Sequence, residues 1–196
     1  MGFKSLRVLN DEIIEGGGGF GMHPHDNMEI ITVVTEGTLE HKDTEGNGGI
    51  LRPGDVQVMS AGSGLSHSEI NRSETEPLSL FQLWIATKER DIPPQYGQKT
   101  FDFVADTLVA VASGFDDAGA LPMHQDARVL VGNFTQGASA SHTIGEGRGA
   151  FVFIIEGTFM VGNETLERRD AIEIEDAHAV SMMSPTGGRI IIVETV

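Results

Sequence analysis

Short runs of β-forming residues, separated by turns rich in glycine, asparagine and proline, fill most of the sequence and constrain its fold strongly. Val, Ile, Phe and Thr dominate these runs, and no stretch carries the apolar stripe of a helix over three turns. Short strands at nearly regular spacing are typical of all-β sandwiches and barrels. We therefore predict an all-β fold with strands at 6–10, 28–37, 38–43, 55–60, 78–87, 106–113, 127–134, 149–157, 158–163, 170–175 and 189–196.

One strand–turn–strand pattern occurs twice. The string Glu-Gly-Thr joins two such runs at 36–38 and again at 156–158, and a polar turn and a further strand follow each copy. Repetition of a supersecondary unit indicates an internal duplication. Between the copies, the segment 91–98 contains two adjacent prolines and favours an extended linker. We therefore expect two tandem domains, 1–95 and 96–196.

Composition excludes several functional classes. The 196 residues include no cysteine, which excludes a disulfide scaffold, thiol catalysis and metal sites built on thiolates. A net charge of −16 argues against direct contact with nucleic acid but is compatible with a basic protein partner. No apolar run reaches the length of a membrane span, and the N-terminal residues lack the pattern of a signal peptide. We predict a cytoplasmic protein that makes no membrane contact.

Two pairs of polar residues have the spacing of metal ligands on strands. His23 and His25 follow a glycine-rich segment, and His67 and Glu69 follow another. Residues two apart on a strand share a face, so facing strands would bring three imidazoles and a carboxylate together. Either pair of residues alone can arise by chance, but the two pairs together favour a binding site for one divalent transition metal. Iron fits best, while manganese, cobalt, nickel, copper and zinc accept the same donors.

From residue 20 to 71 the sequence resembles the pirin branch of the cupins. The two cupin motifs correspond here to His23, His25, Glu29 and Gly37, and then to Gly54, Gly62, His67 and Asn71. Ser60 stands where the second motif has proline. Glu29 lies one residue too close to Gly37, so strand alternation turns it away from the metal, and Ile30 takes the register position.

The resemblance implies a bicupin, with two tandem jelly-roll-type β-barrels. The N-terminal barrel (1–95) would bind the metal, and the C-terminal barrel (96–196) would be a degenerate cupin that has lost its ligands. It implies His23, His25, His67 and Glu69 as the ligands. Family chains have further strands before the segment that begins this sequence, so we expect N-terminal strands to be missing here.

The other histidines form no such pairs. We expect His124, His142 and His178 to be surface residues or hydrogen-bonded polar residues. We expect His41 to face solvent or to lie at a sheet edge, and a supporting role behind the metal ligands is the less favoured alternative. The acidic residues of turns and linker are expected to serve solubility, as at Asp43, Glu45, Glu74, Glu76, Asp116 and Asp117.

The resemblance also implies an activity. Pirin-like proteins are similar to quercetin 2,3-dioxygenases, metal-dependent enzymes that open the central ring of a flavonol with O2 and release carbon monoxide. Glu69 would accept the proton of the flavonol hydroxyl. Apolar residues that would line the pocket or form core are Phe20, Met22, Met28, Val33, Met59, Leu65, Phe81 and Trp84. The alternatives are an iron-binding, redox-sensing regulator that acts through protein partners, and a scaffold with a vestigial metal site.

Overall fold

The computed structural model describes residues 2–196, which form nineteen β-strands and no helix, so the predicted all-β class is confirmed. Within this range no helix could therefore span a membrane. The strands are β1 (Leu6–Ile14), β2 (Gly19–His25), β3 (Met28–Glu36), β4 (Leu39–Asp43), β5 (Gly48–Leu51), β6 (Asp55–Ser60), β7 (Leu65–Asn71), β8 (Leu78–Ala86), β9 (Gln95–Thr100), β10 (Thr107–Ser113), β11 (Leu121–Pro122), β12 (Arg128–Phe134), β13 (Ser139–Thr143), β14 (Gly149–Gly157), β15 (Phe159–Val161), β16 (Glu164–Leu166), β17 (Ala171–Ile174), β18 (Ala179–Met183) and β19 (Gly188–Thr195).

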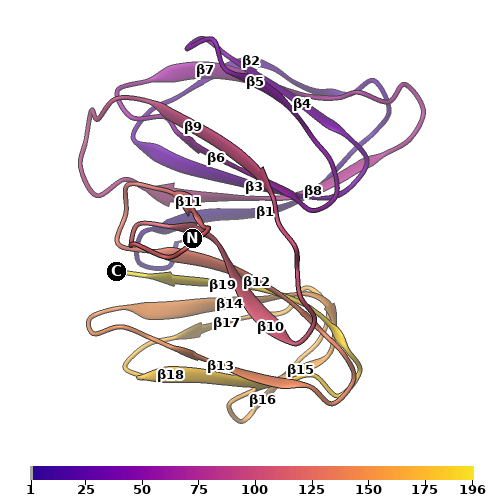
Figure 1. The fold of residues 1–196 in the computed structure, drawn as a ribbon, viewed down its shortest axis with the longest axis vertical. Coiled ribbons are helices and arrows are strands. Elements are labelled where there is room, and N and C mark those ends of the chain that lie inside the picture. The colour runs from indigo at the N-terminus through magenta and orange to yellow at the C-terminus, as the bar shows by residue number, and fades with distance from the viewer. Residues whose placement is uncertain (1) are drawn as a thin grey trace. The chain divides into compact units, whose positions relative to one another are not determined.

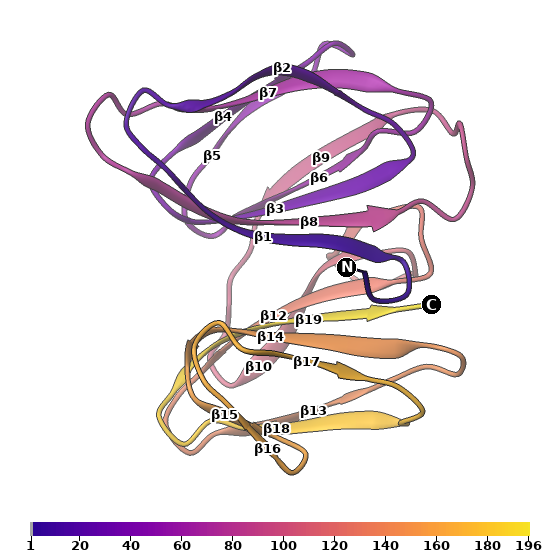
Figure 2. The same ribbon diagram turned by 180° about the vertical axis from the view of Figure 1, so that it is seen from behind.

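The chain forms two compact units. The first runs to Phe101 and includes Leu121–Gln125, and the second contains Asp102–Ala120 and Asp126–Val196. In the first unit, one antiparallel sheet has the order β1-β8-β3-β6-β9 and the other has the order β2-β7-β4-β5. Both views show these two sheets as facing layers (Figures 1 and 2). In the second unit one sheet includes the order β10-β12-β19-β14-β17, and the other has the order β13-β18-β15-β16.

The second unit repeats the topology of the first. The order β1-β8-β3-β6 becomes β12-β19-β14-β17, and β2-β7-β4-β5 becomes β13-β18-β15-β16, each strand number being raised by eleven. The glycines of the two Glu-Gly-Thr turns, Gly37 and Gly157, share a φ of 79°. A Cβ would lie 2.6 Å from the Pro77 carbonyl oxygen at Gly37 and 2.0 Å from the Gly187 oxygen at Gly157. The repeated string therefore makes the same glycine-dependent turn in both units.

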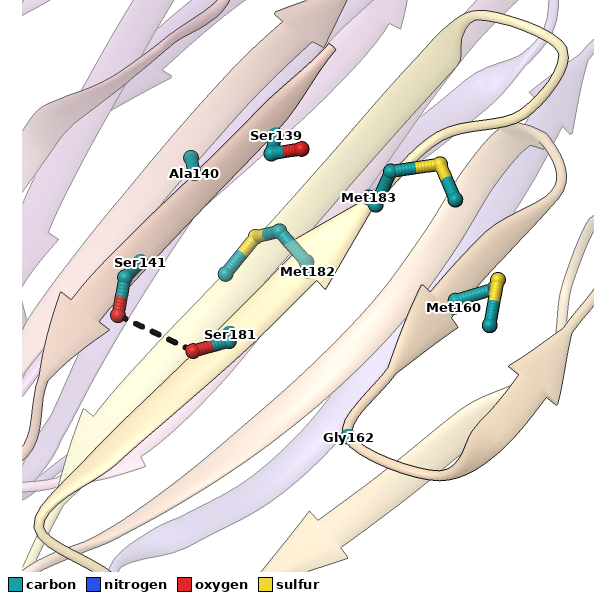
Figure 3. A pocket seen from close by; sticks show the side chains of 8 residues that line it. All are labelled: Ser139, Ala140, Ser141, Met160, Gly162, Ser181, Met182 and Met183. Atoms are coloured by element: carbon teal, nitrogen blue, oxygen red, sulfur yellow. Dashed lines mark hydrogen bonds between the residues drawn. The ribbon is translucent and has the colours of Figure 1, made fainter. Parts of the chain in front are cut away.

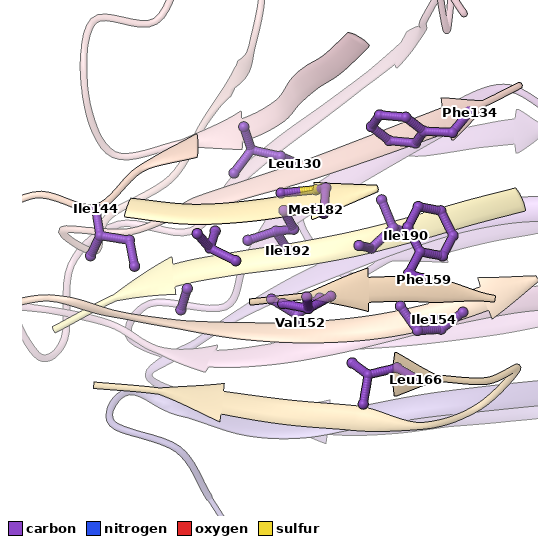
Figure 4. Packing of buried hydrophobic residues seen from close by; sticks show 13 residues of the cluster. Leu130, Phe134, Ile144, Val152, Ile154, Phe159, Leu166, Met182, Ile190 and Ile192 are labelled. Atoms are coloured by element: carbon purple, nitrogen blue, oxygen red, sulfur yellow. The ribbon is translucent and has the colours of Figure 1, made fainter. Parts of the chain in front are cut away.

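Each unit has its own buried apolar core. In the second unit it lies between the two sheets, where isoleucine, valine and leucine pack around Phe134 and Phe159 (Figure 4). In the first unit, one cluster lies around Leu39 and Leu78, and another lies around Ile30 and Met59. Full burial of such side chains stabilises the fold by roughly 1.5–3 kcal/mol each.

The predicted linker at 91–98 is partly wrong. Its second half begins β9, which pairs antiparallel with β6 and matches Met59 with Tyr96. Tyr96 packs against the cluster that contains Ile30 and Met59. Pairing with an otherwise open strand edge and burial of the tyrosine ring outweigh the turn-like composition of this segment.

Candidate metal centre

Three histidines from two neighbouring strands meet on one face of the smaller sheet of the first unit. His23 pairs directly with His67 across the β2–β7 ladder. The ring centroids of His23 and His67 are 4.4 Å apart. The ring centroid of His25 lies 4.9 Å from that of His23 and 5.0 Å from that of His67. When each of the three histidines contributes one ring nitrogen, these three nitrogen atoms all lie within 4.8 Å of one another. This spacing allows all three imidazoles to reach one ion.

A β-bulge in β2 positions the ligands. Three steps along β2, from Phe20 to His23, match two steps along β7, from Glu69 to His67. Gly19 begins the strand at a φ of 147°, where a Cβ would lie 2.3 Å from the Glu69 carbonyl oxygen. The glycine-rich segment thus lets β2 approach β7 closely, and the bulge turns His23 toward His67.

The imidazoles offer unused nitrogen atoms in their neutral form. Within residues 2–196, the Nε2 atoms of His25 and His67 are buried and have no hydrogen-bond partner. Burial, followed by the neighbouring His23, His41 and His25, lowers the pKa of His67 to about 3. Burial and His23 also lower the pKa of His25. Neutral imidazoles with orphaned nitrogens are what a metal needs, so the residues fit a bound divalent ion.

Glu69 lies beside this cluster and is held by an amide. Gln82 on β8 donates from Nε2 to both carboxylate oxygens at 2.9 Å, and its own oxygen accepts from Trp84 Nε1 at 2.8 Å. Burial raises the pKa of Glu69, and the hydrogen bond from Gln82 opposes that effect. The ligand atoms of Glu69 group within 4.8 Å with those of His67 and His41. The carboxylate is thus next to the histidine cluster, with a fixed orientation.

The prediction for His41 is wrong. His41 has no exposed surface, and β4 lies between β7 and β5 rather than at an edge. Its Nδ1 is 3.4 Å from Nδ1 of His67, and burial lowers its pKa. The signal was present in the sequence, because His41 is two residues from the apolar Leu39, which is also fully buried.

Two acidic residues also differ from their expected role in solubility. The side chain of Asp43 has no exposed surface and lies 3.6 Å from Nε2 of His41. Asp117 pairs with Arg128 at 2.6 Å in the second unit. Both carboxylates have specific partners in the structure, although both lie next to glycine-containing segments whose composition is typical of a solvated turn.

Glu29, which strand alternation turns away from the metal, is fully buried and accepts a hydrogen bond from Ser60. Neither residue belongs to the two ligand groups found among residues 2–196. Burial raises the pKa of Glu29, and the Ser60 hydroxyl opposes that shift. The serine at the motif's proline position therefore serves a neighbouring carboxyl group.

The expected pocket residues divide into three sets. Val33, Met59, Leu65 and Phe81 are buried core residues. Met28 and Trp84 pack against the cluster around Ile30, whereas Phe20 and Met22 are exposed on β2. A separate open hollow of about 470 Å³ lies beside His25 and is lined by Pro24, His25, Asp26, Thr44, Ser63, Gly64, Leu65 and Ser66.

The second unit lacks the histidine–carboxylate pair on its equivalent strand. The inward-facing residues of β18 are the buried Val180 and Met182, and His142 pairs with Val180 where His23 pairs with His67 in the first unit. The Nε2 atom of His142 lies 2.8 Å from the buried carboxylate of Glu194. His124 bonds to Gln95 and His178 is exposed, so these three histidines are hydrogen-bonded or exposed, as expected.

An open groove of about 500 Å³ in the second unit has a different chemical character. Figure 3 shows hydroxyl and thioether side chains along it, with Ser141 and Ser181 joined by a hydrogen bond. Its lining contains no titratable group, so it offers no acid–base pair and none of the imidazole or carboxylate ligands found in the first unit.

The fold and the cluster can be compared with known proteins. The pirin family model matches residues 1–85, and the model for the quercetinase C-terminal cupin domain matches residues 110–195. A quercetin 2,3-dioxygenase from Escherichia coli (strain K12) is 38% identical over 192 residues, covering 98% of this chain and 83% of that protein.

Solved structures agree with this sequence similarity. The crystal structure of YhhW from Escherichia coli has a TM-score of 0.96 and 37% identity, and the match covers 100% of this chain and 83% of that chain. The crystal structure of the bacterial pirin YhhW in complex with nickel(II), also from Escherichia coli, has a TM-score of 0.93 and 36% identity, covering 100% of this chain and 84% of that chain. With this similarity along both units, the repeated cupin topology and the histidine cluster, the chain belongs to the pirin family.

Proposed function

We propose that the first unit binds one divalent transition metal through His23, His25, His67 and Glu69, and that the loaded protein cleaves flavonols with O2. One observation carries the proposal. Three imidazoles offer ligand atoms within 4.8 Å of one another. Two of them, His25 and His67, keep a buried Nε2 atom without a partner in the described chain.

Glu69 is our candidate for both a ligand and the proton acceptor. Gln82 fixes its carboxylate beside the imidazoles, and burial raises its pKa. A bound divalent metal would supply Lewis-acid activation of the flavonol hydroxyl. The hollow beside His25 offers the hydroxyls of Thr44, Ser63 and Ser66 to a polyhydroxylated ligand.

The relatives support the same reaction class. The E. coli relative that is 38% identical carries the name quercetin 2,3-dioxygenase, and the similar YhhW structure contains nickel(II). We propose iron as the native metal because three imidazoles and a carboxylate leave positions open in an octahedral shell. The same donors accept nickel, manganese, cobalt, copper and zinc, so metal analysis decides among them. The cytoplasmic location stays a prediction.

The test combines metal content with turnover. Protein purified with iron should hold about one equivalent of metal, remove the flavonol absorption band and release carbon monoxide. The His67→Ala variant should lose both the metal and the activity, because it removes the central ligand. His178→Ala, which removes an exposed histidine of the second unit, should retain both. Less than about a tenth of an equivalent of metal in the wild type would count against the whole site.

A second outcome would distinguish a regulatory protein from a flavonol dioxygenase. A protein that holds one equivalent of metal but never converts quercetin or related flavonols is not a flavonol dioxygenase. The net charge of −16 favours a basic protein as the partner of such a regulator. Pull-down with the metal oxidised and reduced would then identify a partner whose binding depends on the oxidation state.

A further inference from the structure

His41 contacts the histidine cluster through a ring nitrogen. Its Nδ1 lies 3.4 Å from Nδ1 of His67, and both side chains are fully buried. A hydrogen bond between two imidazole nitrogens needs one protonated and one bare nitrogen. The tautomers of His41 and His67 are therefore coupled to each other.

The other side of His41 faces a carboxylate. Oδ2 of Asp43 lies 3.6 Å from Nε2 of His41, and neither side chain is exposed. The carboxylate is fixed in the β4–β5 turn, where it accepts hydrogen bonds from the backbone N–H groups of Glu45 and Asn47 and from the side-chain amide of Asn47. A fixed negative charge at this distance favours the proton of His41 on Nε2, which leaves Nδ1 bare.

Tyr96 holds the His41 ring in this orientation. The two rings stack at a centroid distance of 4.9 Å and an interplanar angle of 19°. The tyrosine hydroxyl bonds in turn to Gln98 at 2.7 Å and Gln57 at 3.2 Å. Rotation of the His41 ring about its attachment is therefore restricted from one face by a side chain that is itself held.

We propose that His41 is a positioning residue of the metal centre. As the Nε2–H tautomer it accepts a hydrogen bond from Nδ1–H of His67 and leaves His67 with a bare Nε2. That Nε2 is one of the buried nitrogen atoms without a hydrogen-bond partner in residues 2–196, and it is the atom that would meet the metal. Outer partners of this kind fix the tautomer and direction of a ligating histidine. The inference rests on the proposed metal centre and adds Asp43 and His41 as its support.

His41 could instead be read as a ligand, since its ligand atoms group with those of His67 and Glu69. The contacts argue against that reading. Its Nδ1 faces a nitrogen of His67, and its Nε2 faces the carboxylate of Asp43. Nε2 of His41, like Nε2 of His67, has no hydrogen-bond partner within residues 2–196, but it lies 3.6 Å from the Asp43 carboxylate, which favours a proton on it rather than a metal.

The first test needs neither metal nor substrate. Nitrogen-15 NMR of the histidine rings in the metal-free protein should show His67 protonated at Nδ1 and His41 protonated at Nε2. The opposite tautomers would overturn the proposal. Because the measurement is made without turnover, the inference can stand even if flavonols prove not to be the substrate.

The second test uses two amide variants of His41 and titration with Zn²⁺. The oxygen of His41→Asn can occupy the Nδ1 position and accept from His67, whereas His41→Gln reaches the Nε2 position and leaves His67 Nδ1 without its acceptor. Both variants lose the same ring stacking on Tyr96, so they share the packing loss. We expect His41→Gln to weaken zinc binding by about 10–100-fold and His41→Asn to stay close to wild type. Equal losses in both variants would overturn the proposal, as would a zinc-bound nitrogen signal from His41.

Discussion

At the scale of single residues, the orientation of Glu69 depends on Gln82. The amide of Gln82 must direct its NH2 group at the carboxylate, because its oxygen already accepts from Trp84. The same NH2 group also lies 3.3 Å from the Thr32 hydroxyl. One amide thus satisfies two buried groups, and its removal would leave the Glu69 carboxylate without its main donor.

We predict that Gln82→Leu weakens metal binding by about 10–100-fold and destabilises the protein by about 1–3 kcal/mol. The carboxylate of Glu69 would lose two hydrogen bonds that favour its charged form, so its pKa would rise further. Isothermal titration with Zn²⁺ and urea unfolding measure the two effects. Trp84→Phe removes one donor to Gln82 and leaves Glu69 bonded, so it should cost less than Gln82→Leu. An unchanged zinc affinity in Gln82→Leu would show that Gln82 has no part in the site.

The sequence predicts some of these residues better than others. His23, His25, His67 and Glu69 stand out because spacing by two on a strand is a local pattern. Gln82 carries no such signal, because its role depends on β8 facing β7 across the barrel. The burial of His41 was predictable from its spacing of two from the apolar Leu39. A lone histidine among charged neighbours nevertheless favours the solvent-facing interpretation.

At the scale of elements, the two Glu-Gly-Thr turns depend on their glycines for two separate reasons. Both turns combine a positive φ with a neighbouring carbonyl oxygen where a Cβ would have to lie. Gly46 has a φ of 88° but no atom within 4 Å of such a Cβ. The three positions thus separate the cost of backbone strain from the cost of a steric clash.

We predict that Gly37→Ala and Gly157→Ala each destabilise the protein by about 2 kcal/mol or more, while Gly46→Ala costs about 1 kcal/mol. All three variants place an alanine in the left-handed region, which strains the backbone. In Gly37→Ala and Gly157→Ala the new Cβ also clashes with a neighbouring backbone segment, which must shift. Urea unfolding followed by circular dichroism gives the differences. A Gly37→Ala variant no less stable than Gly46→Ala would contradict the steric argument.

The elements themselves were partly predictable. Strands such as β3 and β14 are rich in β-branched residues, with two phenylalanines in β14, and stand out in the sequence. β9 has the sequence QYGQKT and directly follows two prolines, so its composition does not predict a strand. It forms a strand because it pairs with β6. β2 has a similar explanation, since its glycines and Pro24 are tolerated by a bulged strand at the end of its sheet.

At the scale of the whole molecule, the charge of −16 includes acidic residues with internal roles. The side chain of Glu194 has no exposed surface. Arg148 Nε lies 2.7 Å and Arg128 Nη1 3.1 Å from its oxygens, and the backbone N–H of Gly145 donates to it at 2.9 Å. Burial alone would raise the pKa of Glu194, but hydrogen bonds from His142, Gly145 and Arg128 outweigh it and lower the pKa to about 2.

We predict that Glu194→Gln destabilises the protein by about 3 kcal/mol at neutral pH, and that the difference shrinks in acid. The folded pKa lies below the ordinary value of 4.5, so the stabilisation is complete above that value and is lost as the pH falls toward about 2. Urea unfolding of both proteins at several pH values measures the difference. Glu164→Gln changes an exposed glutamate and should show no such trend. A constant difference from neutral pH to about pH 3 would contradict the assignment.

The position of β2 has a consequence for how long an ion would stay. β2 is the last strand of its sheet, with β7 as its one neighbour, and it carries two of the three clustered imidazoles. Strands at such positions open more readily than central ones. Fraying of the β2–β7 ladder would withdraw His23 and His25 together, so the dissociation rate of the metal would follow the opening rate of this one strand. Amide exchange along Gly19–His25 would then report metal retention, slowing when the ion binds and setting the lower limit of its residence time.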